Sequence, residues 1–183
     1  MKKRAIGLAV LALAFSAVPA SAQAQYCFGS SVVSCQYLGD TGFEQGTTYW
    51  HYSMGSHQST VWDPCAWGGG TTGAADLEPG DSVLQEVFTD SFPVWTIRLD
   101  LYKTSTSVTA NDYFKVKVYS SATGVTETKL VKARDYSGLC GSMISFPLSN
   151  NYSNTYVRVI IQKNADATAT MYVDNVAFFG RSS

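Results

Sequence analysis

Three segments in the second half of the chain alternate apolar and polar residues with a period of two. They cover residues 94–102, 113–119 and 156–162, and in each one every second side chain is apolar. That period is the repeat of a β-strand with one buried face, whereas the spacing of an amphipathic helix is almost absent after the N-terminal segment. We therefore predict three strands, and we assign Trp95 to the core because it shares one side of its strand with Ile97.

Four further segments have the length and composition of strands, at 82–88, 127–132, 143–148 and 170–179. Residues that favour turns, such as the sequence Pro-Gly before the first of them, separate the predicted strands. Several strands of this length with one apolar face predict an all-β fold. We expect two antiparallel sheets packed as a β-sandwich, for which jelly-roll connectivity is one common solution.

The N-terminus has the three parts of a secretory signal peptide. Three basic residues at 2–4 precede an apolar run at 5–18, and small residues with an A-x-A spacing follow. The apolar run is shorter than the roughly 20 residues that span a bilayer. We therefore predict a signal peptide at 1–24, a single exported module at 25–183 with no membrane insertion, and an extracellular or periplasmic location.

The charge balance bears on the partners of the protein. The chain has 13 Lys and Arg residues against 14 Asp and Glu residues, and three of the basic ones lie in the predicted signal peptide, so the exported part carries a formal charge of about −4. Nucleic acids and anionic membranes select basic surfaces, so this balance argues against both. The only histidines are His51 and His57, which constrains any histidine-based chemistry.

All four cysteines, Cys27, Cys35, Cys65 and Cys140, lie in the predicted exported part. An even number of cysteines in an oxidising compartment predicts two disulfides, for which three pairings exist. We favour Cys27–Cys35 with Cys65–Cys140, because the first two share a Gly/Ser-rich stretch and the other two lie in glycine-flanked loops. A zinc site is the rival interpretation, and neither a C-x-x-C nor an H-x-x-x-H spacing supports it.

Three short motifs occur in a familiar order. The sequence LGDTGFEQG at 38–46 is followed by Trp50, VLQEV stands at 83–87, and MYVDNVAF stands at 171–178. They resemble the opening N-x-x-F-E-x-G…W, the L-x-Q-x-V strand and the closing Y-V-D-N-V strand of carbohydrate-binding modules related to families 4, 9 and 22, which are galactose-binding-like jelly rolls. The resemblance covers nearly the whole predicted module, with Asp40 in place of the opening asparagine.

The resemblance implies a secreted, non-catalytic module that binds a polysaccharide or other glycan and packs Trp50 in its core. It also implies a structural calcium ion held between the N- and C-terminal strands by Glu44 and Asp174. Calcium is a hard cation that takes roughly six to eight oxygen ligands, which carboxylates and backbone carbonyls can supply. We expect the ion to join the ends of the module and to raise its stability without chemistry.

Glycan binding needs flat apolar rings beside polar groups that bond hydroxyls. Trp62 and Trp67 are candidates, because they flank Cys65 in a segment that we expect a disulfide to hold. The glycine-rich run 68–73 lacks the lysine of a phosphate-binding loop, and we interpret it as a flexible loop. Packing within the loop is the alternative role for both tryptophans.

The polar sides of the predicted strands are the second candidate for a binding surface. Their side chains combine flat or long bodies with polar tips, and together they could line one concave sheet surface. The residues that we assign to binding there are Arg98, Tyr102, Tyr113, Tyr119 and Arg158. The alternative is an ordinary solvated face, on which tyrosines are common because of their β-propensity.

Catalytic motifs are absent from the sequence, which contains no G-x-S-x-G and no H-E-x-x-H. We therefore predict that the protein is not an enzyme. Two other functions stay open. A secreted surface protein could use the same fold to contact a protein partner, and a small polysaccharide lyase or hydrolase could use His51 or His57 with Tyr113 and Arg158.

Overall fold

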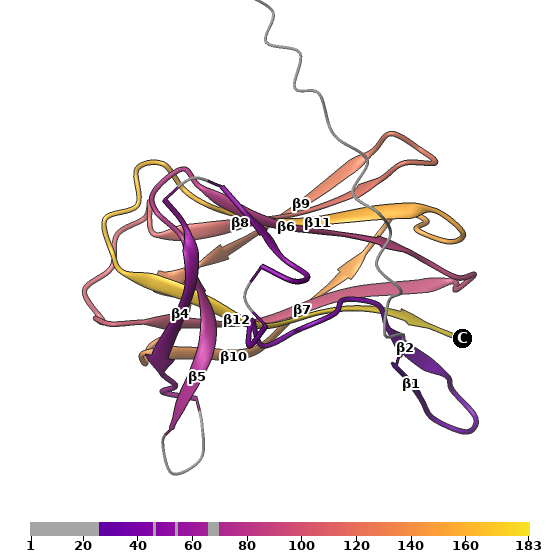
Figure 1. Ribbon diagram of the computed structural model, residues 1–183, viewed down its shortest axis with the longest axis horizontal. Helices are drawn as coiled ribbons and strands as arrows, with labels where there is room; N and C mark the ends of the chain where they lie inside the picture. Colours follow the sequence, from indigo (N-terminus) through magenta and orange to yellow (C-terminus); the bar gives the residue numbers. More distant parts are fainter. Residues whose placement is uncertain (1–25, 46, 54, 66–69) are drawn as a thin grey trace, which may run out of the picture.

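The computed structural model describes residues 26–45, 47–53, 55–65 and 70–183. The predicted signal peptide and Trp67 lie outside the described residues. Within these ranges, no helix has the length and apolar character that crossing a bilayer requires. The strands form two antiparallel sheets packed against each other, so the predicted β-sandwich of the jelly-roll type is confirmed (Figure 1).

One sheet is built around the C-terminal strand. β12 pairs with β2 and β5 along one edge and with β7 along the other, and β7 also pairs with β10. Both β12 and β10 contain an irregularity in the pairing with β7, between residues 174 and 177 and between residues 141 and 144. The seven strands of this sheet are β1 (Tyr26–Phe28), β2 (Ser34–Gln36), β4 (His57–Trp62), β5 (Thr71–Asp76), β7 (Val94–Lys103), β10 (Cys140–Leu148) and β12 (Met171–Arg181).

The other sheet has five strands in the order β3, β6, β11, β8 and β9. Its pairings run without irregularity along β6, β11, β8 and β9. A short 3-10 helix, Ala133–Asp135, follows the last of these strands. The bounds of the five strands are β3 (His51–Tyr52), β6 (Ser82–Phe88), β11 (Tyr156–Lys163), β8 (Tyr113–Ser120) and β9 (Thr126–Lys132).

All seven predicted strands are present, and β6 has the predicted bounds. The first five strands were not predicted, because they are short or lack a clear alternation. The interpretation of the glycine-rich run as a flexible loop is wrong for residues 71–73, which begin β5. Gly73 is needed there because a Cβ atom on it would lie 2.9 Å from the carbonyl oxygens of Gly42 and Phe43.

The core between the sheets contains both tryptophans that we assigned to it. Trp95 is 2% exposed and stacks on Phe178, with ring centroids 5.0 Å apart. Trp50 is fully buried, with its ring 4.7 Å from that of Phe43, and its Nε1 donates a hydrogen bond of 2.8 Å to the carbonyl oxygen of Asp40. The period-two pattern therefore identified the buried side of the three alternating strands correctly.

The two disulfides have the favoured pairing. Cys27–Cys35 joins β1 to β2 within one hairpin, where the two residues are direct partners in the pairing register. Cys65–Cys140 joins the segment after β4 to the start of β10, 75 residues further along the chain. In the chain-entropy account, closing the longer loop restricts the unfolded chain more.

Candidate functional site

The opening motif forms a tight turn beside β12. The Asp40 carboxylate accepts hydrogen bonds from the backbone N–H groups of Glu44 and Gln45, at 2.7 and 2.8 Å. The carbonyl oxygen of Thr41 accepts a hydrogen bond of 2.9 Å from the Val176 N–H. Aspartate therefore does the capping expected of asparagine at this position, and the turn brings the Glu44 side chain to the C-terminal strand.

Glu44 and Asp174, the two residues assigned to calcium, lie on either side of one hydroxyl group. Oγ1 of Thr72 is 3.2 Å from Oε1 of Glu44 and 3.2 Å from Oδ2 of Asp174. A hydroxyl carries a single hydrogen, so it can donate to only one of these carboxylates. At the other carboxylate, the hydroxyl oxygen of Thr72 and a carboxylate oxygen face each other without a hydrogen between them. A cation bound by both oxygens would stabilise this arrangement.

Asp174 is fully buried. The Tyr102 hydroxyl donates to its Oδ2 at 2.8 Å, and the Asn175 N–H donates to its Oδ1 at 2.6 Å. Desolvation by burial outweighs these hydrogen bonds and raises the pKa of Asp174 to about 6. The site thus holds a buried carboxyl group that accepts hydrogen bonds but forms no ion pair with a lysine or arginine among the described residues.

Backbone oxygens lie close to this carboxylate pair. The carbonyls of Gly42 and Phe43 face β5 beside Gly73, whose N–H donates to Oε1 of Glu44 at 2.8 Å. In the part of the chain that the structure describes, no three Asp, Glu, His or Cys side chains gather to hold a metal. A cation here would therefore use carbonyl and hydroxyl oxygens beside the two carboxylates. Such an all-oxygen set fits calcium better than zinc.

The outer face of the five-stranded sheet brings together three predicted ligand residues, Tyr113, Tyr119 and Arg158. The register places Arg158 of β11 between Tyr119 of β8 and Glu86 of β6. Its guanidinium carbon lies 5.8 Å from the centroid of the Tyr119 ring, and its Nε forms an ion pair with the Glu86 carboxylate. Arg158 is therefore held flat against the sheet, beside the tyrosine.

Two further aromatic side chains extend this surface. Phe88 and Tyr156 are partners in the register, with ring centroids 5.1 Å apart, and they are 48% and 47% exposed. Phe88 was not among the predicted ligand residues, although the alternation within 82–88 places it on the polar side of its strand. We use the term tyrosine face for the surface formed by Phe88, Tyr113, Tyr119, Tyr156 and Arg158.

Lysine and amide groups lie among the rings of the tyrosine face. Nζ of Lys115 is 5.8 Å from the centroid of the Tyr113 ring, and Nζ of Lys117 donates a hydrogen bond of 2.8 Å to Oε1 of Gln162. No carboxylate among the described residues forms an ion pair with either lysine. The face therefore offers flat apolar surfaces and hydrogen-bond donors at close spacing.

The expectation of one concave surface with all five candidates is wrong. Arg98 and Tyr102 belong to β7 of the seven-stranded sheet, so they lie on the other side of the sandwich from Tyr113. Alternation shows which residues share a side of a strand, but it does not show which sheet the strand joins. Tyr102 is also only 1% exposed, and burial raises its pKa, so it remains a hydrogen-bond donor to Asp174 and cannot contact a glycan.

Trp62 is exposed, as expected for a ligand contact, but it stands apart from the tyrosine face. It ends β4 with 63% of its surface exposed. It borders a cavity of about 360 Å³ that Pro64, Leu139 and Tyr172 also line. The other predicted loop tryptophan, Trp67, lies outside the described residues.

Comparisons with known proteins support the fold. No protein-family model matches the chain, and no curated protein matches it. Among solved structures, the carbohydrate-binding module TmCBM61 in complex with β-1,4-galactotriose is 15% identical, with a TM-score of 0.52 over 79% of this chain and 98% of that one. The CBM22-1 xylan-binding domain of Paenibacillus barcinonensis Xyn10C is 14% identical, with a TM-score of 0.48 over 89% and 99%. The predicted resemblance to jelly-roll carbohydrate-binding modules is thus confirmed for the fold.

Proposed function

We propose that the protein is a secreted, glycan-binding module whose ligand lies across the tyrosine face. The observation that carries this proposal is the set of accessible rings on one face, with the Arg158 guanidinium beside Tyr119, the Lys115 ammonium beside Tyr113, and the exposed pair Phe88 and Tyr156. Rings of this kind stack on the apolar faces of sugars, and the polar tips between them bond hydroxyl groups. The fold shared with TmCBM61, a protein solved with a galactose oligosaccharide, supports the class of ligand.

The geometry of the sheet favours a chain of sugars over a single one. Neighbouring strands lie about 4.8 Å apart, and side chains on one face repeat about every 6.7 Å along a strand. Tyr113, Tyr119 and Tyr156 are spread over two adjacent strands of this flat array. A ligand that contacts all of them spans several sugar units.

We also propose that Glu44 and Asp174 bind a calcium ion, together with the Thr72 hydroxyl and neighbouring backbone carbonyls. The fit of the all-oxygen donor set and the buried Asp174 carboxyl group, which forms no ion pair among the described residues, support it. The ion would join the opening turn, β5 and β12. Its role is structural, because the tyrosine face lies on the other sheet.

The arrangement of the histidines does not favour the lyase alternative. His51 lies in β3, and three strand spacings, roughly 14 Å, separate that strand from β8 with Tyr113. His57 lies in the other sheet. Neither imidazole is therefore placed to share a proton-transfer site with Tyr113 and Arg158.

A glycan array and pull-downs with insoluble polysaccharides test the proposed binding. We expect at least one glycan to bind, and Tyr119→Ala and Tyr156→Ala to weaken that binding about tenfold each, as the loss of a stacking ring does. Val94→Ala is the matched control, because it removes an exposed apolar side chain from β7 of the other sheet. Loss of binding in Trp62→Ala alone would place the site at the end of β4. If no glycan binds, the proposal is overturned.

Thermal unfolding with and without EDTA tests the calcium site. We expect the melting temperature to fall on chelation and to recover with added calcium, since an ion that binds only the folded state stabilises it. Glu44→Gln should abolish this response. Glu78→Gln, which removes an exposed carboxylate elsewhere, should retain it. Identical melting curves with and without EDTA would contradict the proposed site.

A further inference from the structure

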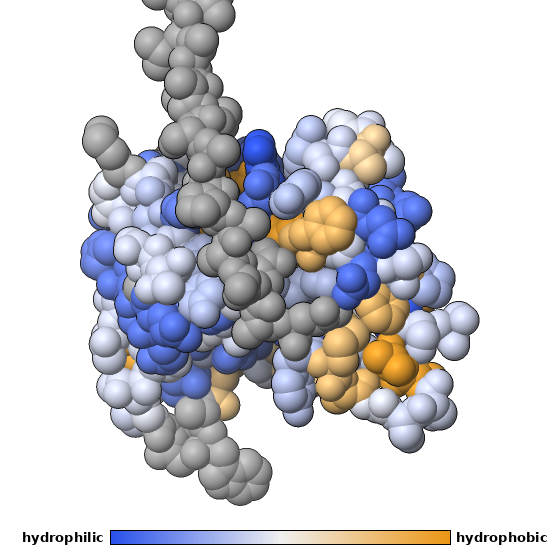
Figure 2. All heavy atoms as spheres, turned by 45° about the vertical axis from the view of Figure 1, so that its right-hand side comes forward, coloured by the Kyte–Doolittle hydropathy of each residue, from blue (hydrophilic) through white to orange (hydrophobic). Residues whose placement is uncertain are grey.

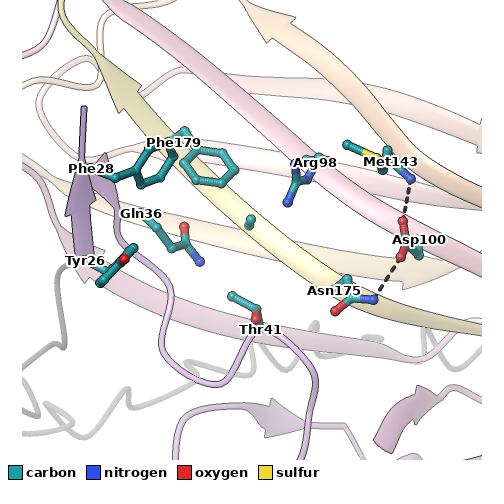
Figure 3. A pocket seen from close by; sticks show the side chains of 10 residues that line it. Tyr26, Phe28, Gln36, Thr41, Arg98, Asp100, Met143, Asn175 and Phe179 are labelled. Atoms are coloured by element: carbon teal, nitrogen blue, oxygen red, sulfur yellow. Dashed lines mark hydrogen bonds between the residues drawn. The ribbon is translucent and has the colours of Figure 1, made fainter. Parts of the chain in front are cut away.

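A groove crosses the outer face of the seven-stranded sheet, away from the tyrosine face. Its volume is about 350 Å³. Figure 3 shows Tyr26, Phe28 and Phe179 at one end, and Arg98 and Asn175 toward the other. The hairpin β1–β2 forms the aromatic end, and the irregular segment of β12 forms the polar end.

The aromatic end of the groove is exposed and held in place. Tyr26 and Phe28 are 69% and 48% exposed, with ring centroids 6.0 Å apart, and Phe28 meets Phe179 edge to face at 6.2 Å. In Figure 2, which brings this side of the molecule forward, hydrophobic side chains gather at the lower right, the level at which the hairpin lies in Figure 1. The disulfide of the hairpin and its pairing with β12 limit the entropy that these rings lose on binding.

Arg98 supplies free hydrogen-bond donors at the centre of the groove. Its guanidinium carbon lies 5.4 Å from the centroid of the Phe179 ring. No ion pair engages Arg98 among the residues that the structure describes, so its N–H groups remain open to a ligand. An arginine placed against a ring can donate to several oxygens of a ligand that stacks beside it.

Two irregularities of the sheet aim side chains at the polar end. Asn175 and Met143 have positive φ angles of 50° and 52°, and each lies in the irregular segment of its strand. The Asp100 carboxylate stabilises both segments, because it accepts hydrogen bonds from Nδ2 of Asn175 at 2.8 Å and from the Met143 N–H. The Asn175 side chain therefore keeps its oxygen for a ligand. Backbone held in this way is often associated with binding sites.

The charges of the groove favour an uncharged ligand. Arg98 and Asp100 are the two charged residues of the lining, and they stand two residues apart on one side of β7, so their formal charges sum to zero. A pyranose ring matches the remaining features, because its apolar face suits the rings and its hydroxyls suit Arg98 and Asn175. We propose that this groove binds a neutral sugar residue, as a second glycan site on the sheet opposite the tyrosine face.

Methyl NMR of Met143, which lines the groove and is 67% exposed, gives a local readout of binding. The probes are neutral di- and tetrasaccharides of glucose, galactose, xylose and mannose, with galacturonic acid oligomers as the charged comparison. We expect one neutral series to shift the Met143 signal in a saturable way. Phe28→Ala should raise the dissociation constant at least tenfold, and Arg98→Gln at least threefold. Val32→Ala, at an exposed position of the hairpin outside the groove lining, should leave it unchanged.

The same titration separates this site from the tyrosine face. Tyr119→Ala alters only that face. A Met143 shift that persists in this variant therefore supports an independent groove site, even if the glycan array shows no binding at the tyrosine face. No shift with any neutral sugar would overturn the groove proposal. A shift only with the acidic oligomers, or one that Phe28→Ala leaves unchanged, would overturn it as well.

Discussion

Polar side chains on the outer faces of the two sheets differ in their exposure to solvent. On the five-stranded sheet, the alternation of β8 continues along the strand, and the side chains opposite the core stay accessible. On the seven-stranded sheet, β7 begins in the same way, but Asp100 and Tyr102, on the side of the strand opposite the core, are both buried. The reason is that β10 and β12 both deviate from regular pairing beside Asp100, and β4 with the segment after it lies beside Tyr102.

The difference indicates separate roles for the polar groups of the two faces. The hydroxyl of buried Tyr102 donates to Oδ2 of Asp174 at 2.8 Å, and the buried Asp100 carboxylate accepts hydrogen bonds from Asn175 and Met143. Such groups are costly to bury, and their partners hold segments of the chain together. Half-buried groups such as Lys115, which forms no ion pair among the described residues, are accessible to a ligand. Substitutions of the first kind should therefore change stability, and those of the second kind should change binding.

The largest effect is expected for Asp100→Ala. The substitution leaves two irregular segments without the acceptor for Met143 and Asn175, so we expect the free energy of unfolding to fall by about 3 kcal/mol. Urea unfolding measures it, with the exposed Asp135→Ala as control. A loss below about 1 kcal/mol would show that Asp100 does not stabilise the bulged strands.

The next effect is a loss of stability in acid that depends on Asp112. Burial alone would raise the pKa of this carboxyl group, but hydrogen bonds from Thr109, Thr168 and Ala169 lower it to about 2. The stabilisation is therefore present above the ordinary pKa near 4 and is lost as the pH falls toward 2. We expect about 2 kcal/mol of acid-sensitive stability that Asp112→Asn lacks. Parallel curves of stability against pH for the two proteins would refute this assignment.

On the tyrosine face, Tyr156→Ala should weaken glycan binding about tenfold, which corresponds to about 1.4 kcal/mol of binding free energy. The ring is 47% exposed, so we expect the free energy of unfolding to change by less than about 1 kcal/mol. Isothermal titration calorimetry and urea unfolding of the same preparation measure both quantities. A larger loss of stability than of affinity would remove the distinction between the two faces.

The smallest effect is expected for the ion pair between Glu86 and Arg158, whose side chains are both 39% exposed. Surface pairs of this kind contribute roughly 0 to 1 kcal/mol, because water and salt screen them. A double-mutant cycle with Glu86→Gln and Arg158→Gln should give a coupling energy for unfolding below about 0.5 kcal/mol. A coupling above 1 kcal/mol would mean that this face also stabilises the fold.

Residues that follow from period-two alternation could be predicted, and those that depend on contacts between sheets could not. Trp95, Phe114 and Val159 are buried as their pattern predicts. Tyr102 fits the polar side of its pattern just as well, yet it is buried, and its hydroxyl donates to a distant carboxylate, that of Asp174. No spacing in the sequence signals that partnership across 72 residues.

The groove illustrates the same limit at the level of a site. Tyr26 and Phe28 lie in a strand of three residues, too short for an alternation to be recognised. Their partner Phe179 lies near the other end of the chain. Only the pairing of β2 with β12 brings the three rings to one place.

By itself, the sequence determined the strand periodicity, the buried side of the three alternating strands, the favoured disulfide pairing and the motifs that contain Glu44 and Asp174. Local chemistry is sufficient for the strand periodicity, the buried sides and the motifs, because side-chain alternation and turn residues act over a few positions. The tertiary structure decided which sheet each strand joins, and with it the division of the predicted ligand residues between two faces. That choice depends on pairings between strands that are distant in sequence, whose register no local pattern contains.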